Sequence, residues 1–565
     1  MIINGGQRSG NNLFHSLESF SISSGMEAIF NNDLEIKNIF INVSGNEISN
    51  IEGTLTIKGN ANLFFLNDNG IVFGKDANIN IGGSFIASTA QSVRFNDGCE
   101  FSARNGDSPC VTTDLPIGLD FGSNPGAITV NGDGIQILAE NNSIPIDLGN
   151  SISGISLKVG KTLALIGNEV NLKGAIVSAY GGKIEIASLN SGFVGLQETE
   201  SGLSFNYNNA AINYQDLNIL EQALINASGE GQEEISLNGK NILLSDGSFI
   251  LSQNRGDIDS KVININAKET LKLSGTSIKG KVPSSILSQS LNTGKAANIE
   301  INTKHILISD RGRISGTNYS GSENINVKVK ATDSIKIING IINAIGFSQG
   351  NSGNLSLVTS NLQLLDIGAI TSSSYGSGNS GKISIDAKII EVAGAFGFTR
   401  SNISATSFGF GNAGSLYIKT EQLKVLDGGS VSSSAFAQGD AGSVIINASK
   451  FIEVDGINQN FKGNNPESTI RSAIITLPPA AQKIRGMLLS PTGNAGEVII
   501  NTPELNVINQ GIVSIRNDGT GNEGVLSINA EKINLDNSGS ITGVSNNGKA
   551  DDGENINITA DIILV

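Results

Sequence analysis

The residues best suited to catalysis are three charged side chains that lie close together in the sequence, Asp310, Arg311 and Arg313. A carboxylate can act as a general acid or base in the cleavage of a polysaccharide, and an arginine beside it can act as a base. Such sites need several carboxylates on one exposed face, whereas this segment supplies one. We therefore expect an exposed, charged corner here, and we expect the chain to have no catalytic residues.

The two histidines, His15 and His305, are the next candidates. Neither has a nucleophilic Ser or Cys motif near it, so neither indicates a catalytic triad, and structural or surface roles are expected for both. No glycine-rich segment has the complete pattern of a phosphate-binding loop, in which Gly-Lys-Ser/Thr follows a first glycine at fixed spacing. The repeated Gly-Gly-x-Gly-x-Asp pattern of calcium loops is also missing from the sequence. The sequence therefore predicts no cofactor and no metal ion.

The chain has two cysteines, Cys99 and Cys110. Gly106 and Pro109 lie between them and favour turns, which is compatible with a disulfide across this segment. The alternative is two unrelated thiols, because the sequence does not determine whether the two Cα atoms lie within about 7 Å of each other. A zinc site is not expected, since no second Cys or His pair lies at ligand spacing.

The composition favours short strands and argues against several kinds of partner. The 565 residues include 69 glycines and no tryptophan, 16% of them are charged, and the mean hydropathy is +0.00. Few charges and many glycines suit short strands with tight turns better than helices. The net charge of −15 argues against binding to nucleic acid or to an anionic membrane surface. No stretch approaches the roughly 20 apolar residues of a membrane span.

An internal repeat organises the second half of the chain. A turn of the type Gly-x-x-Gly recurs there, and its last glycine stands at positions 353, 381, 414 and 442, then at 496 and 524. Three of the steps between these glycines are equal (353 to 381, 414 to 442 and 496 to 524). A second marker, Gly-x-Ile, keeps the same step at positions 312, 340 and 368, and the glycines at 511 and 539 are separated by this step as well. Two markers with the same period argue against a chance alignment.

One repeat holds three short segments in which apolar and polar residues alternate, residues 354–358, 361–365 and 368–373. This period of two is typical of strands. Three strands with corners in about 28 residues make one coil of a parallel β-helix, whose strands stack about 4.8 Å apart. We therefore predict an all-β, single-stranded parallel β-helix. A β-sandwich array needs longer periods, and a propeller blade needs about 40–50 residues, so both alternatives fit less well.

Three regions follow from this pattern. Residues 1–125 hold eleven of the 22 phenylalanines, and we expect a non-repetitive cap that covers the first strand edge of the solenoid. Residues 126–296 continue the β-helix irregularly, and residues 214–228 are expected to form strand rather than a short helix. Residues 297–565 form the repetitive stalk, with an insertion loop at about residues 458–483, where the step from Gly442 to Gly496 is nearly twice the usual one.

The N-terminal segments resemble a known family. The segments are residues 4–16 (NGGQRSGNNLFHS), 61–74 (ANLFFLNDNGIVFG) and 82–90 (GGSFIASTA). Their order is similar to that in the secretion domain of the filamentous-haemagglutinin family, the passenger proteins of two-partner secretion. Residues 115–122 (LPIGLDFG), 160–165 and 181–185 look like the versions common in cyanobacteria. The strong likeness covers about residues 1–125, and a weaker one runs through the repeats.

The resemblance implies a right-handed β-helix that is exported through an outer-membrane barrel transporter with periplasmic recognition domains. The family's hallmark is an Asn-Pro-Asn-Gly-Ile turn, which matches Asn67, Asp68, Asn69, Gly70 and Ile71 except that Asp68 stands at the proline position. We interpret these five residues as a transporter-recognition turn, with an ordinary structural turn as the alternative. Family members carry a signal peptide before the segment that begins at residue 4, so we expect this chain to be truncated at its start and, because the repeat has no cap at its end, there as well.

The sequence thus predicts a secreted or cell-surface, adhesin-like structural protein without enzymatic activity, whose partners include surface glycans or proteins but not nucleic acid. Two alternatives remain open at this point. One is a carbohydrate-active β-helix enzyme, and the other is a non-functional gene fragment.

Overall fold

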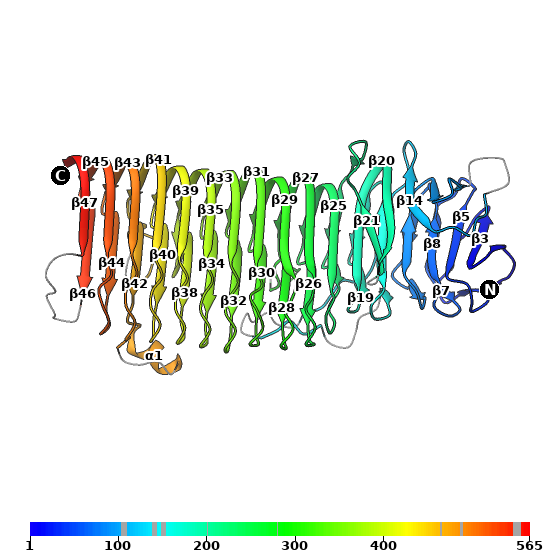
Figure 1. Ribbon diagram of the computed structural model, residues 1–565, viewed down its shortest axis with the longest axis horizontal. Helices are drawn as coiled ribbons and strands as arrows, with labels where there is room; N and C mark the ends of the chain where they lie inside the picture. Colours follow the sequence, from blue (N-terminus) through cyan, green and yellow to red (C-terminus); the bar gives the residue numbers. More distant parts are fainter. Residues whose placement is uncertain are drawn as a thin grey trace. The chain divides into compact units, whose positions relative to one another are not determined.

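The computed structural model describes residues 1–102, 110–137, 144–148, 154–199, 202–278, 281–463, 466–485, 490–545 and 555–565. The chain divides into two compact units, Met1–Ile286 and Leu287–Val565. Each unit is built from strands that stack in parallel, coil upon coil (Figure 1). The predicted fold, a right-handed parallel β-helix, is confirmed.

Each coil of the unit Leu287–Val565 consists of one long and one short strand. The long strands are β29 (Asn298–Ser309), β31 (Val327–Ile338), β33 (Leu355–Leu365), β35 (Ile383–Ala393), β39 (Leu416–Leu426), β41 (Val444–Asp455), β43 (Val498–Ile508), β45 (Leu526–Asp536) and β47 (Ile556–Leu564). The short strands are β30 (Arg313–Asn318), β32 (Ile341–Gly346), β34 (Ala369–Ser374), β38 (Asn402–Ser407), β40 (Ser430–Ala435), β42 (Thr469–Ile474), β44 (Ile512–Asn517) and β46 (Ser540–Ser545). Strands of each kind pair in parallel with their equivalents in the neighbouring coils.

The first two strands expected in each repeat are joined in one bent strand. The bend lies at a threonine in several coils, and its hydroxyl donates a hydrogen bond to the carbonyl two residues further on: Thr420 Oγ1 lies 3.0 Å from the Gln422 carbonyl oxygen, and Thr502 Oγ1 lies 3.1 Å from that of Glu504. After each bend, two consecutive residues are less buried than their neighbours. The alternation of more and less buried positions then resumes in the second half of the strand. Strand pairing therefore continues on both sides of the corner, and in several coils its register is interrupted only at the corner itself.

The repeat glycines stack directly above one another, as the period requires. A Cβ built on Gly381 would lie 2.1 Å from the Gly353 carbonyl oxygen, and one built on Gly414 would lie 2.0 Å from that of Gly381. The column therefore holds both across the regular step and across the longer step from Gly381 to Gly414. Only a residue without a side chain permits this approach of two backbones.

An asparagine ladder runs beside these glycines. The side-chain oxygen of Asn351 accepts a hydrogen bond of 2.7 Å from the Asn379 N–H, and that of Asn379 accepts one of 2.8 Å from the Asn412 N–H. The same contact continues through Asp440 and Asn494 to Asn522. These bonds satisfy backbone donors at the turns, where no strand pairing is available.

The two irregular steps in the repeat are insertions that contact each other. The hairpin of β36 (Ala395–Phe396) and β37 (Thr399–Arg400) follows β35, and the segment after β41 lies against it, with the Lys462 N–H 2.6 Å from the Gly397 carbonyl oxygen. The insertion predicted at residues 458–483 lies on one coil, because β41 still pairs with β43. It is split in two by β42, and its second part contains the helix α1 (Pro479–Arg485).

The unit Met1–Ile286 contains shorter coils with three or four sides. The longest ladder consists of β3 (Asn12–Leu17), β5 (Asn38–Val43), β8 (Asn62–Leu66), β11 (Phe85–Ser88), β17 (Thr162–Gly167), β20 (Lys183–Thr199), β25 (Glu234–Ser245) and β27 (Val262–Ser274). A second ladder is formed by β6 (Ser49–Ile51), β9 (Ile71–Phe73), β15 (Ile128–Asn131), β18 (Val170–Lys173) and β23 (Leu217–Leu220), and a third by β1 (Ile2–Ile3), β4 (Glu27–Phe30), β7 (Thr54–Ile57) and β10 (Asn78–Asn80).

A fourth ladder is formed by β16 (Ile155–Leu157), β19 (Ile176–Ala179), β24 (Leu224–Asn226) and β26 (Phe249–Asn254), while β28 (Ser285–Ser290) contains the boundary between the units. Residues 214–228, expected to be strand, contribute β23 and β24.

An antiparallel sheet covers one side of the first coils. It contains β12 (Ser92–Phe95), β13 (Glu100–Ser102), β14 (Pro116–Phe121) and β21 (Gly202–Asn206), and the end of β20 lies between β14 and β21. The short strands β2 (Gln7–Ser9) and β22 (Asn213–Tyr214) add two further antiparallel pairs. Between this sheet and the coils lies an aromatic core in which Phe40 stacks on Phe14 and Phe64, with ring centroids 5.0 and 4.7 Å away. Six of the eleven phenylalanines of residues 1–125 lie in this core: Phe14, Phe40, Phe64, Phe95, Phe101 and Phe121.

Candidate functional site in the N-terminal unit

The turn Asn67–Ile71 is a corner of the coil and is mostly buried. Asn67 is fully buried, and its amide donates hydrogen bonds of 2.9 Å to the Glu47 carbonyl oxygen and to Ser49 Oγ. Its side-chain oxygen accepts a hydrogen bond of 3.0 Å from the Asn69 N–H. The Asn67 amide nitrogen thus holds the turn to the preceding coil, while its side-chain oxygen holds the backbone of the turn itself.

The next coil packs on the other side of this turn. The Gly126 N–H donates a hydrogen bond of 2.7 Å to the Asp68 carbonyl oxygen, and the Ile71 N–H lies 3.0 Å from the Ala127 carbonyl oxygen. Gly70 has a φ of +129°, which disfavours any residue with a side chain. The strands on either side, β8 and β9, pair with strands of other coils and not with each other, so the turn does not close a hairpin.

We predict that Asn67→Ala destabilises the N-terminal unit by about 2–4 kcal/mol, because it leaves several buried partners without a hydrogen bond. Chemical unfolding followed by circular dichroism measures the change. Asn50→Ala is the matched control, since Asn50 is exposed on the neighbouring strand β6 and should change the unfolding midpoint little. Equal midpoints for the two variants would show that the buried amide contributes nothing.

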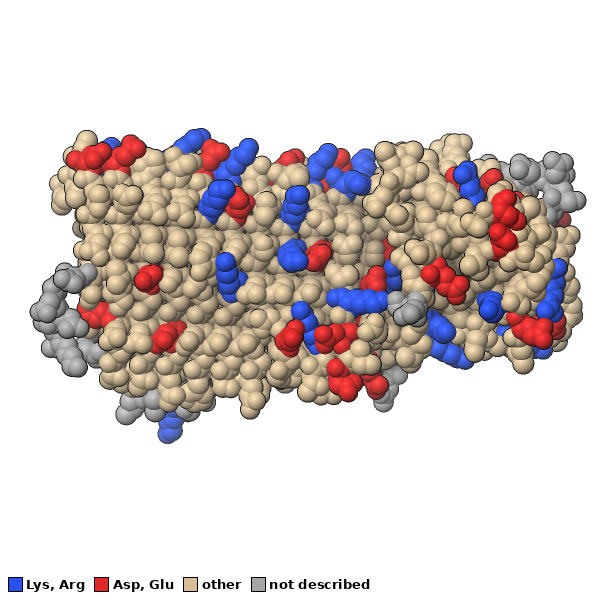
Figure 2. Space-filling view, in the orientation of Figure 1, with Lys and Arg blue, Asp and Glu red and all other residues tan. Residues whose placement is uncertain are grey.

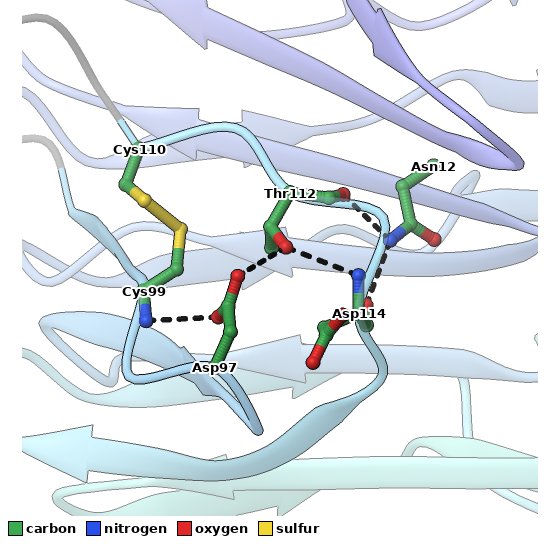
Figure 3. The surroundings of a disulfide bond; sticks show 6 residues. All are labelled: Asn12, Asp97, Cys99, Cys110, Thr112 and Asp114. Carbon is green, nitrogen blue, oxygen red and sulfur yellow. Dashed lines mark hydrogen bonds between the residues drawn. A yellow bond between two sulfur atoms is a disulfide. The ribbon is translucent and has the colours of Figure 1, made fainter.

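The second feature is the loop closed by Cys99 and Cys110, whose sulfurs are bonded and whose Cα atoms lie 5.8 Å apart (Figure 3). Asp97 ties both ends of this loop together, because its carboxylate accepts hydrogen bonds from the Cys99 N–H at 3.0 Å and from Thr112 Oγ1 at 2.5 Å. These two hydrogen bonds, Thr112 first, lower the pKa of Asp97. Residues 103–109 of the loop lie outside the described residues.

A chain of asparagine amides connects this loop to the coils. Asn12 donates hydrogen bonds of 3.1 and 2.9 Å to the carbonyl oxygens of Thr112 and Asp114 (Figure 3). Asn38 donates to Asn12 at 3.1 Å, and Asn62 donates to Asn38 at 3.0 Å. The loop is therefore held on three successive coils by side chains that lie above one another. The sequence motifs contained Asn12 and Asn62, but the two steps that relate them through Asn38 are unequal, and the sequence shows no regular repeat here.

A buried ionic cluster lies on β20. The Glu185 carboxylate is 1% exposed, accepts hydrogen bonds from Ser236 Oγ at 2.9 Å and Asn238 Nδ2 at 3.1 Å, and lies 3.5 Å from Lys183 Nζ. Burial raises the pKa of Glu185 to about 7, against the opposite influence of Lys183. Burial lowers the pKa of Lys183, but the charges of Glu185 and Glu234 outweigh it, so that this pKa is raised.

The raised pKa of Glu185 predicts a pH dependence of stability. A folded carboxyl with a pKa near 7 binds more protons than the unfolded chain between about pH 4.5 and 7, so the free energy of unfolding should fall as the pH rises through this window. Glu185→Gln should reduce this slope by the contribution of Glu185, because a neutral amide does not titrate; burial also raises the pKa of Glu233, whose contribution remains. Thermal unfolding at a series of pH values measures it, with Glu198→Gln, an exposed position on the same strand, as the control. The same slope in both variants would contradict the assignment.

Two of the three charged residues expected at a corner, Asp310 and Arg311, lie directly before β30, and the third, Arg313, is the first residue of that strand. Asp310 and Arg311 both have positive φ, of 52° and 70°, and Asp310 accepts a hydrogen bond from Ser309 Oγ at 2.8 Å. Arg313 is buried on β30, while Arg311 is exposed. The structure thus separates the two guanidinium groups, one on the surface and one within the strand, and does not assemble the three residues into one site.

The structure places His305 beside a serine and an aspartate, which the sequence did not suggest. His305 Nδ1 lies 3.0 Å from Ser334 Oγ, and Nε2 lies 3.6 Å from Asp333 Oδ2. The histidine and aspartate side chains are 46% and 54% exposed, so water screens the charges that a triad needs to keep dry. His15 is buried, its ring meets Phe30 edge-on at 5.1 Å, and burial lowers its pKa. Neither histidine therefore has the surroundings of a base that activates a catalytic nucleophile.

The described residues contain neither a candidate metal site nor a candidate membrane-spanning helix. No group of three or more His, Cys, Asp or Glu side chains there is placed so that it could hold a metal ion. No helix in this part of the chain is long and apolar enough to span a membrane.

Comparison with known proteins identifies the N-terminal region. Residues 1–240 match the family model of the TPS secretion domain. Among solved structures, the chain is similar to the HMW1 secretion domain from Haemophilus influenzae, with 15% sequence identity over 99% of this chain and 96% of the other, and a TM-score of 0.24. No curated protein matches the chain. The resemblance inferred from the N-terminal motifs is confirmed by the match of residues 1–240 to this family model.

Proposed function

We propose that this chain is an adhesin-like structural protein that an outer-membrane transporter of the two-partner-secretion class exports to the cell surface or the medium. The observation that carries the proposal is the family match of residues 1–240. The repetitive unit Leu287–Val565 supports it, because stacked coils with solvent-facing polar residues suit a surface stalk.

The turn Asn67–Ile71 is proposed as part of the signal that the periplasmic domains of the transporter read. Asn67, Gly70 and Ile71 are buried in the folded unit. A partner can contact these three residues only while the chain is unfolded, so this recognition has to precede the formation of the coils. Recognition and folding are then consecutive events on the same residues.

Folding outside the cell is proposed to draw the chain through the transporter. Each coil of the stalk contacts its two neighbours, so a folded coil offers a template on which the next coil can form, one at a time. Three buried side chains of one coil, Ile418, Leu423 and Val425, point into the core. Replacing all three with asparagine should stop this process at β39.

An export assay tests the proposal. The full chain, preceded by a cleavable signal peptide, is expressed in a Gram-negative host with or without a two-partner-secretion transporter, and its amounts in the periplasm and outside the cell are compared. Export should depend on the transporter, fall about ten-fold or more in Asn67→Ala/Asn69→Ala and in the triple β39 variant, and be unchanged in Asn50→Ala. Export without a transporter, or its absence with every transporter of this class that is tried, would overturn the proposal.

A further inference from the structure

A groove of about 660 Å³ runs along the outside of the unit Leu287–Val565. It follows the bends of six successive long strands, β35, β39, β41, β43, β45 and β47, and at about 4.8 Å per coil it is about 24 Å long. Small residues line its floor, one per coil: Ala387, Thr420, Ala448, Thr502 and Ala530. Neither the secretion-domain match nor the export mechanism uses this groove.

One wall of the groove is a row of amide and hydroxyl groups. Asn447, Asn501, Asn529 and Thr559 occupy equivalent positions in four successive coils. Asn501 donates a hydrogen bond of 2.9 Å to Asn447, so the amides are aligned along the groove. An amide both donates and accepts hydrogen bonds, and these are the groups that recognise the hydroxyls of a sugar. The row offers the same groups at every coil, which suits a polymer that presents the same hydroxyls at every monomer.

The charges of the groove argue against a polyanion. Lys419 Nζ lies 3.7 Å from Asp386, and Lys450 Nζ lies 2.7 Å from Glu421, so opposite charges pair at its margins. The six charged residues that line it, two lysines and four acidic residues, sum to a charge of −2. Positive and negative side chains are also interspersed on the face in Figure 2, with no patch of one sign. Nucleic acids and sulfated glycans need a positive groove.

The backbone around the groove also argues against an extended peptide. A peptide that binds as an added strand needs an unpaired strand edge. From β35 to β45, each strand is already paired with a neighbour on both sides, apart from one to three residues at the bend. So short an unpaired stretch does not offer the edge that an added strand needs, and the side chains that line the groove are left to bind a ligand.

From these observations we infer that the groove is a binding site for a neutral polysaccharide, which lies along the stalk with its hydroxyls on the row of Asn447, Asn501 and Asn529. This inference names the class of surface ligand for the adhesin-like role proposed above and rests on that role. Export and polysaccharide binding are measured separately, so either can fail without the other.

Affinity electrophoresis of the purified full chain tests the inference. The gels contain one of four neutral polysaccharides (dextran, laminarin, hydroxyethylcellulose or galactomannan), or else polygalacturonate or heparin. At least one neutral polymer should retard the chain, and added salt should not abolish the retardation, because neutral hydroxyls carry no charge to screen. No retardation by any neutral polymer, or retardation by the polyanions alone, would overturn the inference.

Variants locate the site. Asn447→Ala/Asn501→Ala/Asn529→Ala should weaken binding about ten-fold or more, because the hydrogen bonds from this row to the hydroxyls of the ligand are lost. Ser449→Trp, which places a large side chain in the groove, should abolish it. Asn506→Ala/Asn534→Ala changes the same residue type on β43 and β45 beyond the bend and should bind like the unchanged chain. Circular dichroism verifies that each variant is folded, and unchanged binding by the folded groove variants would place any polysaccharide site elsewhere.

Discussion

Gly414→Ala is expected to destabilise the unit Leu287–Val565 by about 3 kcal/mol, and the unfolding midpoint in urea should fall accordingly. A Cβ at this position would lie 2.0 Å from the Gly381 carbonyl oxygen and 2.6 Å from its carbonyl carbon. Both are backbone atoms of a neighbouring coil, so the clash cannot be relieved by the rotation of a side chain. Two coils would have to move apart, and the hydrogen bonds and the core on either side of the turn would be stretched.

Gly321→Ala is the matched control for this substitution. Gly321 lies in a turn of the same unit, and a Cβ built on it has no atom within 4 Å. Replacing it should leave the midpoint unchanged or raise it slightly, since alanine reduces the freedom of the unfolded chain. If Gly414→Ala and Gly321→Ala had equal midpoints, close approach of backbones could not be the reason for the repeat glycines.

The fold of the stalk was predictable from the sequence because each sequence repeat corresponds to one coil of the structure. Equivalent positions such as Gly353 and Gly381 must stack, and only glycine fits, so the period appears in the chain as a fixed residue type at a fixed step. The two longer steps, which end at Gly414 and Gly496, could be recognised in the sequence for the same reason. The extra residues form insertions outside the column, and the glycines at either end of each step still stack. That these insertions contact each other was not predictable, since no pattern relates two loops in different coils.

The N-terminal unit was less predictable because it combines two pairing modes. Its phenylalanines indicated a thicker core, but the antiparallel sheet of β12, β13, β14 and β21 leaves no period in the sequence. Strand β20 illustrates the problem: its first half, around Glu185, pairs in parallel with the coils, while its second half, around Val194, pairs antiparallel with β14. Alternation of apolar residues is the same in both modes, so it cannot distinguish them.

The candidate site was located in part by its motif. The sequence pointed to Asn67–Ile71, but whether those residues are exposed depends on the coils before and after them, which contribute Glu47, Ser49 and Gly126. The groove of the stalk left no signal at all in single residues. Its asparagines, such as Asn447 and Asn501, are far apart in the chain and look like ordinary exposed strand positions until the bends bring them into one wall.

Phe40→Ala is expected to cost the N-terminal unit about 3–5 kcal/mol, the range for removing a large aromatic ring from a core. Phe40 is fully buried, lies between Phe14 and Phe64 in a three-ring stack, and also meets Phe95 of the antiparallel sheet edge-on at 5.1 Å. Its loss opens a cavity where the coils and the covering sheet meet, so the sheet should loosen and β12 should become accessible to protease.

Chemical unfolding followed by circular dichroism, together with limited proteolysis, measures both effects of Phe40→Ala. Phe396→Ala is the control, because that ring is 73% exposed and its removal should change the midpoint little. Phe40→Leu should recover more than half of the loss, since it refills most of the volume. A Phe40→Ala protein as stable as Phe396→Ala would mean that the covering sheet is held by its strand pairing to β20 rather than by the aromatic core. The cap would then owe its stability to hydrogen bonds that the sequence pattern does not reveal.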